Sequence, residues 1–253
     1  MKIKLYALIF ILLSVILCES STCTSTGPIE YEMVFVEGGS FRMGATAEQG
    51  DEFCADERPV HYMKINNFYI GKFEVTQEQW KRVMGENPSY FKGSDLPVEK
   101  VSWNDVQLFI EKLNLMTGKK YRLPREAEWE YAARGGKRCG GYKFSGANST
   151  NDIGWVVTNS EETTHPVGSI SYPNELGIYD MTGNVSEWCS DWYGLYSENP
   201  KYNINGPQKG KTRVIRGGSY CYYAESCRNA ARGNCYPSIR MRDLGFRLAM
   251  DSD

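Results

Sequence analysis

Every sustained helical pattern lies in the first half of this 253-residue chain. Beyond Gly136 no stretch keeps apolar residues at helical spacing for three turns, and Gly, Asn, Pro, Ser and aromatic residues dominate to the end. A helical bundle or a doubly wound parallel sheet needs helices along the whole chain, so both are excluded. The pattern predicts an α+β chain of low regular secondary structure, with about three helices and short strands.

The starts of the three helices are marked by local signals. Capping-box spacings predict helices beginning after Thr76 and after Ser102, and Pro124 opens a third, which Gly135-Gly136 ends. Two segments of near-alternating apolar residues are predicted strands: Met33 to Met43 and Phe68 to Val75.

The N-terminus has the pattern of an export signal. Lys2 and Lys4 precede an apolar run that ends at Leu17, too short for a membrane span of about 20 residues. Cys18 follows as in a bacterial lipobox, although Leu17 stands where such boxes have a small residue. We expect a signal peptide over residues 1–17, a Ser/Thr-rich linker over 18–32 and one domain over 33–253. The protein is then exported and held at the membrane, in the periplasm or at the cell surface, by a lipid on Cys18.

Charge and cysteine content limit the partners that the protein can bind and the disulfide or metal sites that it can form. The chain has 29 Lys and Arg against 31 Asp and Glu, a net charge of −2, so we expect no nucleic-acid partner. Eight cysteines in an exported chain can form disulfides, but their pairing cannot be deduced. For Cys54, Cys139 and Cys189 we expect a disulfide or a buried thiol. No Cys-x-x-Cys pair is present to indicate a zinc ribbon.

Four segments carry a resemblance to a known family. They are Phe68–Thr76, Tyr121–Gly136, Gly177–Trp188, and Arg213–Tyr220 with Leu244–Leu248. In this order and spacing they resemble the sulfatase-modifying factor family, whose members contain a formylglycine-generating-enzyme-like domain. The resemblance spans Met33 to Met250 and implies a C-type-lectin-like fold of the formylglycine-generating-enzyme type.

The resemblance also implies an enzymatic alternative. Family enzymes oxidise a sulfatase cysteine to formylglycine with copper held by two cysteine thiolates, soft ligands that suit Cu(I). Those cysteines fall second and seventh after the Gly-Gly-Ser-Tyr segment. Here the second position is Tyr222, the seventh is Cys227, and Cys221 stands at the first. One ligand matches and the other is displaced by one residue, so copper catalysis by Cys221 and Cys227 is the alternative to a non-catalytic protein.

A calcium site is a second implication of the resemblance. Family enzymes place a structural calcium at positions that match Asp180, Gly183, Val185 and Glu187, and calcium favours such carboxylate and carbonyl oxygens. The alternative is a metal-free turn in which Glu187 pairs with an arginine.

The C-terminal segment has the composition of a recognition surface, because tyrosines alternate there with arginines. The candidate ligand-binding residues are Tyr222, Tyr223, Ser226, Asn229, Asn234 and Tyr236. Several arginines have another interpretation, namely pairing inside the fold with the acidic residues of the third helix; for Arg216 and Arg247 we favour it. The segment also resembles the hypervariable ends of proteins that retroelements diversify.

Together these features predict an exported, non-catalytic domain that binds a protein or small-molecule ligand through its C-terminal loops. Two alternatives remain: a copper-dependent formylglycine-generating oxidase, and a structural lipoprotein of the cell envelope.

Overall fold

The computed structural model describes residues 30–197 and 206–252. The predicted signal peptide, Cys18 and most of the predicted linker lie outside these residues. The helices are α1 (Gln77–Met84), α2 (Trp103–Thr117) and α3 (Glu126–Ala133), and the 3₁₀ turns are η1 (Ala47–Gln49), η2 (Ala55–Glu57), η3 (Gly136–Arg138) and η5 (Ala224–Cys227). The predicted mixed α+β architecture is confirmed.

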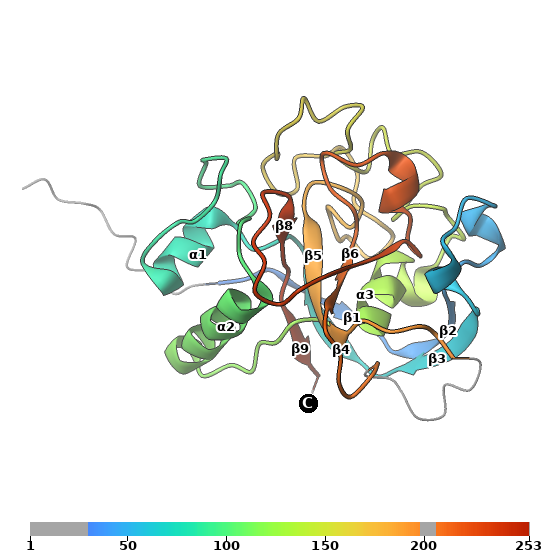
Figure 1. Ribbon diagram of the computed structural model, residues 1–253, viewed down its shortest axis with the longest axis horizontal. Helices are drawn as coiled ribbons and strands as arrows, with labels where there is room; N and C mark the ends of the chain where they lie inside the picture. The colour runs from blue at the N-terminus through green and yellow to red at the C-terminus, as the bar shows by residue number, and fades with distance from the viewer. Residues whose placement is uncertain (1–29, 198–205, 253) are drawn as a thin grey trace, which may run out of the picture.

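In the part of the chain that the structure describes, the strands form three small sheets (Figure 1). The first has the order β1-β4-β9, from β1 (Met33–Val36), β4 (Phe68–Gly71) and β9 (Ala249–Asp251). The second pairs β2 (Gly39–Met43) with β3 (His61–Ile65). The third has the order β7-β6-β5-β8, from β5 (Ser186–Trp192), β6 (Arg213–Arg216), β7 (Arg232–Cys235) and β8 (Leu244–Gly245).

The helix starts follow the predicted local chemistry. The Thr76 hydroxyl accepts from the Gln79 amide at 3.2 Å, and the Gln79 side chain accepts from the Thr76 amide at 2.9 Å. Ser102 and Asp105 make the same reciprocal pair before α2. The third helix begins at Glu126, two residues after Pro124.

The predicted strand over 33–43 is wrong in one respect, because it is two strands in two different sheets. A β-carbon at Gly38 would overlap the backbone of residues 65–67, so the chain can pass there only as glycine and changes direction. β1 then pairs with β4, and β2 pairs with β3. The second predicted strand, 68–75, ends at Gly71.

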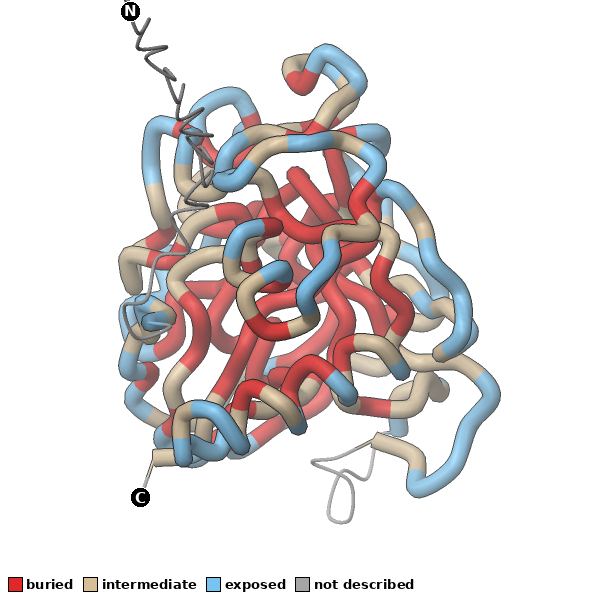
Figure 2. The backbone as a smooth tube through the Cα atoms, turned by 90° about the vertical axis from the view of Figure 1, so that its left-hand side faces the viewer, coloured by how far each residue is buried: buried red, intermediate tan, exposed pale blue. Residues whose placement is uncertain are grey.

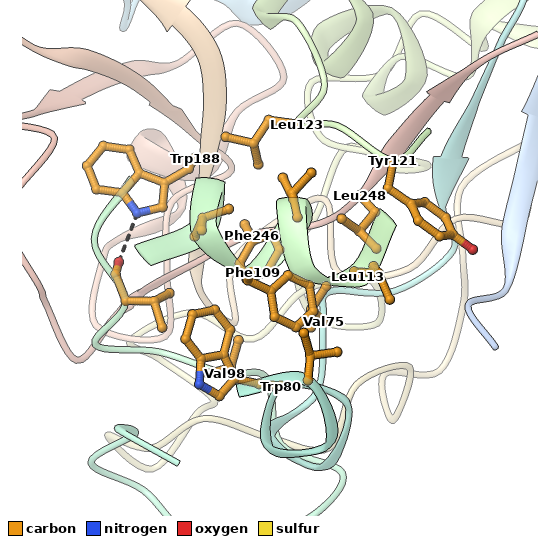
Figure 3. Close-up of a cluster of buried hydrophobic side chains, with 14 of the residues drawn as sticks. Val75, Trp80, Val98, Phe109, Leu113, Tyr121, Leu123, Trp188, Phe246 and Leu248 are labelled. Carbon is orange, nitrogen blue, oxygen red and sulfur yellow. Dashed lines mark hydrogen bonds between the residues drawn. The ribbon is translucent and has the colours of Figure 1, made fainter. Parts of the chain in front are cut away.

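Two clusters of buried apolar side chains form the core. One surrounds α2, where the Trp80 and Phe109 rings stack with centroids 5.0 Å apart and Phe246 meets both edge-on (Figure 3). The other lies around Trp129 of α3, which packs against β2, β3, β5 and β6. Figure 2 shows the buried backbone gathered in the middle of the molecule and exposed residues along the outer loops. Within the described residues no helix has the length and apolarity to cross a membrane.

All six cysteines in the described residues are unpaired. Cys189 is a buried thiol, one of the two expected outcomes. Cys54 and Cys139 are exposed and free, so the expectation of a disulfide or a buried thiol is wrong for these two.

Candidate functional site

The candidate site is the segment between β6 and β7, residues 217–231, here termed the binding loop. It opens with two successive glycines, Gly217 and Gly218, at φ values of +92° and +66°. A β-carbon at Gly218 would overlap the Cys227 sulfur, so the loop folds tightly back on itself at this point. The Tyr220 amide then donates a hydrogen bond to the Asn184 carbonyl at 2.8 Å.

Buried arginines fix the binding loop to the rest of the molecule. Arg228 makes two bonds to the Glu57 carboxylate, of 2.8 and 2.6 Å, across 171 residues of sequence. Arg216, fully buried beneath the loop, pairs with Glu130 of α3 and donates to two loop carbonyls. Next to the loop, Arg232 pairs with Glu126, also on α3, at 2.6 Å. The pairing of arginines with the acidic residues of the third helix is confirmed for Arg216 and Arg232. For Arg247 the pairing is inside the fold as expected, but the partner is Glu187 of β5 and not a residue of the third helix.

The tyrosines, in contrast, face outward. Tyr222, Tyr223 and Tyr236 are 40%, 68% and 58% exposed. Ser226 and Asn234 are also exposed. Within the described residues none of these five predicted binding residues makes a hydrogen bond through its own side chain, so these side chains add no hydrogen bond that holds the loop. They form the exposed set: Tyr222, Tyr223, Ser226, Asn234 and Tyr236.

The sixth predicted binding residue, Asn229, is not part of this surface. It is 1% exposed, its side-chain amide donates to the Tyr142 carbonyl at 3.1 Å, and its own carbonyl accepts from Arg216. Asn229 therefore holds the loop from inside, a role its sequence position did not reveal.

A cavity of about 220 Å³ opens beside the exposed set. Small side chains and glycines shape it, and Tyr222 and Ser226 stand at its border. Both arginines in its wall already carry carboxylate partners, Arg216 with Glu130 and Arg232 with Glu126. The cavity lining is Ser186, Ile215, Arg216, Gly217, Gly218, Tyr222, Ser226, Ala231, Arg232 and Gly233. Such a lining suits a compact, uncharged group.

The two candidate copper ligands lie in the binding loop with different partners. The Cys221 sulfur is 3.3 Å from the Ser219 hydroxyl and 3.6 Å from the Asp243 carboxylate. The Cys227 sulfur is buried and donates to the Tyr223 carbonyl at 3.6 Å. Burial raises the pKa of both thiols, that of Cys227 to about 12. Protein surroundings thus favour thiols over the thiolates that Cu(I) needs.

The candidate calcium segment is buried, and hydrogen bonds from other parts of the chain hold its carboxylates. Both oxygens of Glu187 accept from Arg247, at 2.7 and 2.6 Å, and one also accepts from the Trp129 indole. The arginine pairing considered for Glu187 is therefore present. Asp180 differs, because one oxygen accepts from the Gly168 amide and the other, Oδ1, is buried without a partner.

The sequence reading missed a third carboxylate in this region. Glu74 is buried, and its oxygens accept from the Asn184 side chain and the Val185 amide. Burial, together with the charges of Asp180 and Glu187, raises the pKa of Glu74 well above its ordinary value. Burial likewise raises the pKa of Asp180 to about 6. The buried carboxyls of Glu74, Asp180 and Glu187 thus lie near one positive charge, that of Arg247. The described residues contain no group of three or more acidic, His or Cys side chains arranged as a metal site.

Comparisons with known proteins agree with this architecture. The sequence profile of the sulfatase-modifying factor enzyme 1-like domain matches residues 22–252. The formylglycine-generating enzyme of Streptomyces coelicolor is 38% identical over 87% of this chain and 89% of its own, and the chaperone protein LppX of Paenibacillus barcinonensis is 32% identical over 77% and 83%. Among solved structures, Treponema denticola variable protein 1 has a TM-score of 0.78 at 31% identity, covering 89% of this chain and 97% of its own. PvdO from Pseudomonas aeruginosa has a TM-score of 0.75 at 29% identity, covering 88% and 95%.

Proposed function

We propose that this chain, which belongs to the sulfatase-modifying factor enzyme 1-like family, is a non-catalytic binding protein that contacts a protein partner through the exposed set on its binding loop and the adjoining β7 segment. The observation that carries the proposal is that different residues hold the loop and face the solvent. Buried residues such as Arg228 and Asn229 hold its backbone, while the exposed tyrosines of the loop and of the adjoining segment make no side-chain hydrogen bond. Tyrosine gives broad contact area at low entropic cost, which suits recognition.

The same division supports diversification of the surface. An exposed side chain that makes no hydrogen bond or ion pair can be replaced at little cost in stability, usually within about 0.5 kcal/mol. The name of Treponema denticola variable protein 1 speaks of variation in that relative. A near-copy of the coding segment beside a reverse-transcriptase gene would support diversification here, and a genome without either would refute it.

Binding by the exposed set can be tested with peptides. Ten-residue peptides selected from a random displayed library against the full domain should lose at least tenfold in affinity for the double variant Tyr222→Ser/Tyr223→Ser. Tyr62→Ser is the matched control, because Tyr62 is 70% exposed on β3, outside the loop. Equal affinity of all three proteins would refute the proposal.

The copper oxidase is the second candidate, favoured by the presence of Cys221 and Cys227 in one loop. Anaerobic Cu(I) titration of the reduced domain, read beside conversion of a cysteine-containing sulfatase peptide, decides between the two. Tight one-to-one binding and conversion, both lost in Cys221→Ser and in Cys227→Ser, would establish the enzyme. The tyrosine at the second position, where family enzymes carry a cysteine, favours the opposite outcome.

A structural calcium remains part of the proposal. The unpartnered Oδ1 of Asp180 and the excess of buried carboxyls over arginine fit a cation there. Asp180 and the carbonyls of Gly183 and Val185 would supply oxygens, and Glu187 would have to share its carboxylate with Arg247.

We also propose export and a lipid anchor at Cys18, on the sequence pattern of residues 1–18. A structural role in the cell envelope is compatible with such an anchor. Labelling with radioactive palmitate tests it, since Cys18→Ser should lose the label and Cys23→Ser should keep it.

A further inference from the structure

Strand β7 is an open edge of the four-stranded sheet. Within residues 30–197 and 206–252 it pairs with β6 alone, from Arg213 opposite Cys235 to Arg216 opposite Arg232. In an antiparallel pair, alternate residues point their N–H and C=O groups away from the partner strand. Within the described residues, no backbone group of β7 has a hydrogen-bond partner outside this pairing. Two of its four residues therefore present unpaired donors and acceptors.

The edge has only part of the usual protection of such strands. β7 is four residues long and the charge of Arg232 is turned inward to Glu126, but no proline or lysine lies in the strand to block pairing. Asn234 is exposed, and Gly233 carries no side chain to cover the backbone. The opposite edge of the sheet differs, since β8 is two residues long and fully buried.

This edge is continuous with the cavity of the binding loop. Gly233 of β7 and Ile215, its partner on β6, both line the cavity, and Tyr222 and Ser226 close it on the loop side. A strand added along β7 would run beside the exposed set. Some of its side chains would lie on the face of the β6–β7 pair where the cavity opens. A sugar or other small molecule could fill the cavity but would leave the strand edge unpaired.

We propose that β7 receives an extended segment of a protein partner as an additional strand, with a compact, uncharged side chain of that segment entering the cavity beside Tyr222. The inference rests on the proposed binding function and names the form of the partner. Main-chain hydrogen bonds along β7 give affinity, and the cavity and exposed set select the sequence, as in other strand-addition complexes.

Backbone N-methylation of the partner tests strand addition directly. Two versions of one selected ten-residue peptide, methylated at odd or at even positions, keep every side chain but lose one or the other set of N–H groups. We expect one version to lose at least tenfold in affinity and the other to stay within threefold. Hydrogen exchange of the full domain should show two alternate β7 amides that exchange fast in the free protein and slowly with the unmodified peptide.

The outcomes separate this inference from the binding function it rests on. A peptide that needs Tyr222 but tolerates both methylation patterns, or leaves the β7 amides unprotected, would overturn strand addition and leave the binding function standing. Concentration-dependent protection of β7 without peptide, with a dimer in sedimentation, would make a second copy of the chain the occupant. Failure to select any peptide would count against both proposals.

Discussion

Removing the charge of Glu57 should loosen the binding loop and destabilise the whole domain. Glu57 is 1% exposed in η2 and faces Arg228, itself 2% exposed, at the end of η5. Glu57→Gln keeps the shape and one acceptor but leaves a buried guanidinium without its counter-charge. The two side chains join segments 171 residues apart, so no neighbouring contact substitutes for the pair.

The magnitude follows from the burial of both partners. Breaking a buried ion pair by removing one member costs about 3–5 kcal/mol, because the remaining charge stays desolvated. A domain of this size has about 5–15 kcal/mol of stability in total. At about 2–4 °C per kcal/mol, the melting temperature should fall by about 6–20 °C.

Thermal and urea unfolding of the full domain measure the effect, with Glu32→Gln as the control. Glu32 pairs with Lys72 at 2.9 Å, but its side chain is 67% exposed, so its loss should cost less than about 1 kcal/mol. The double variant Glu57→Leu/Arg228→Met should be more stable than Glu57→Gln, because no buried charge remains. Equal effects of Glu57→Gln and Glu32→Gln would refute the reasoning.

Three further predictions concern single positions. Gly218→Ala should lower the free energy of unfolding in urea by more than about 2 kcal/mol, because the new β-carbon would overlap Cys227. The control Gly141→Ala also has a positive φ but lies in open space, so it should cost only about 1 kcal/mol. Burial and the neighbouring Glu126 charge raise the pKa of Asp191 to about 7. The contribution of protonated Asp191 to stability is therefore present at low pH and is lost as the pH rises from about 4 through 7, by up to about 1.4 kcal/mol per pH unit. Asp191→Asn should flatten this part of the curve of unfolding free energy against pH. Millimolar Ca²⁺ should raise the melting temperature relative to EDTA, and Asp180→Ala should remove the increase; a calcium-independent wild type would refute the site.

Local signals accounted for the parts of the fold that depend on a few neighbouring residues. The caps at Thr76 and Ser102 lie within four residues of what they bind, so their spacing is visible in the sequence. The break at Gly38 was not visible, because the obstacle is the backbone of residues 65–67 on another strand. Local patterns indicated the α+β class, but the C-type-lectin-like fold came only from the family resemblance.

The same limit explains the candidate site. Arg228 and Glu57 meet across 171 residues, Arg216 and Glu130 across 86, and no spacing rule connects them. Sequence reasoning therefore grouped most of the C-terminal arginines with the tyrosines as one recognition surface, and favoured interior pairing only for Arg216 and Arg247. Asn229 was placed on the same surface for the same reason, and its burial became visible only in the fold.

The separation of arginines from tyrosines has a consequence for how such a surface can change. The Arg228 and Arg216 ion pairs hold the backbone of the binding loop from below, and the Gly217-Gly218 turn sets its path. None of these contacts involves the side chain of Tyr222 or Tyr223. Recognition and stability are thus carried by different residues within one loop, so new binding specificities can arise at the tyrosines while the ion pairs stay unchanged.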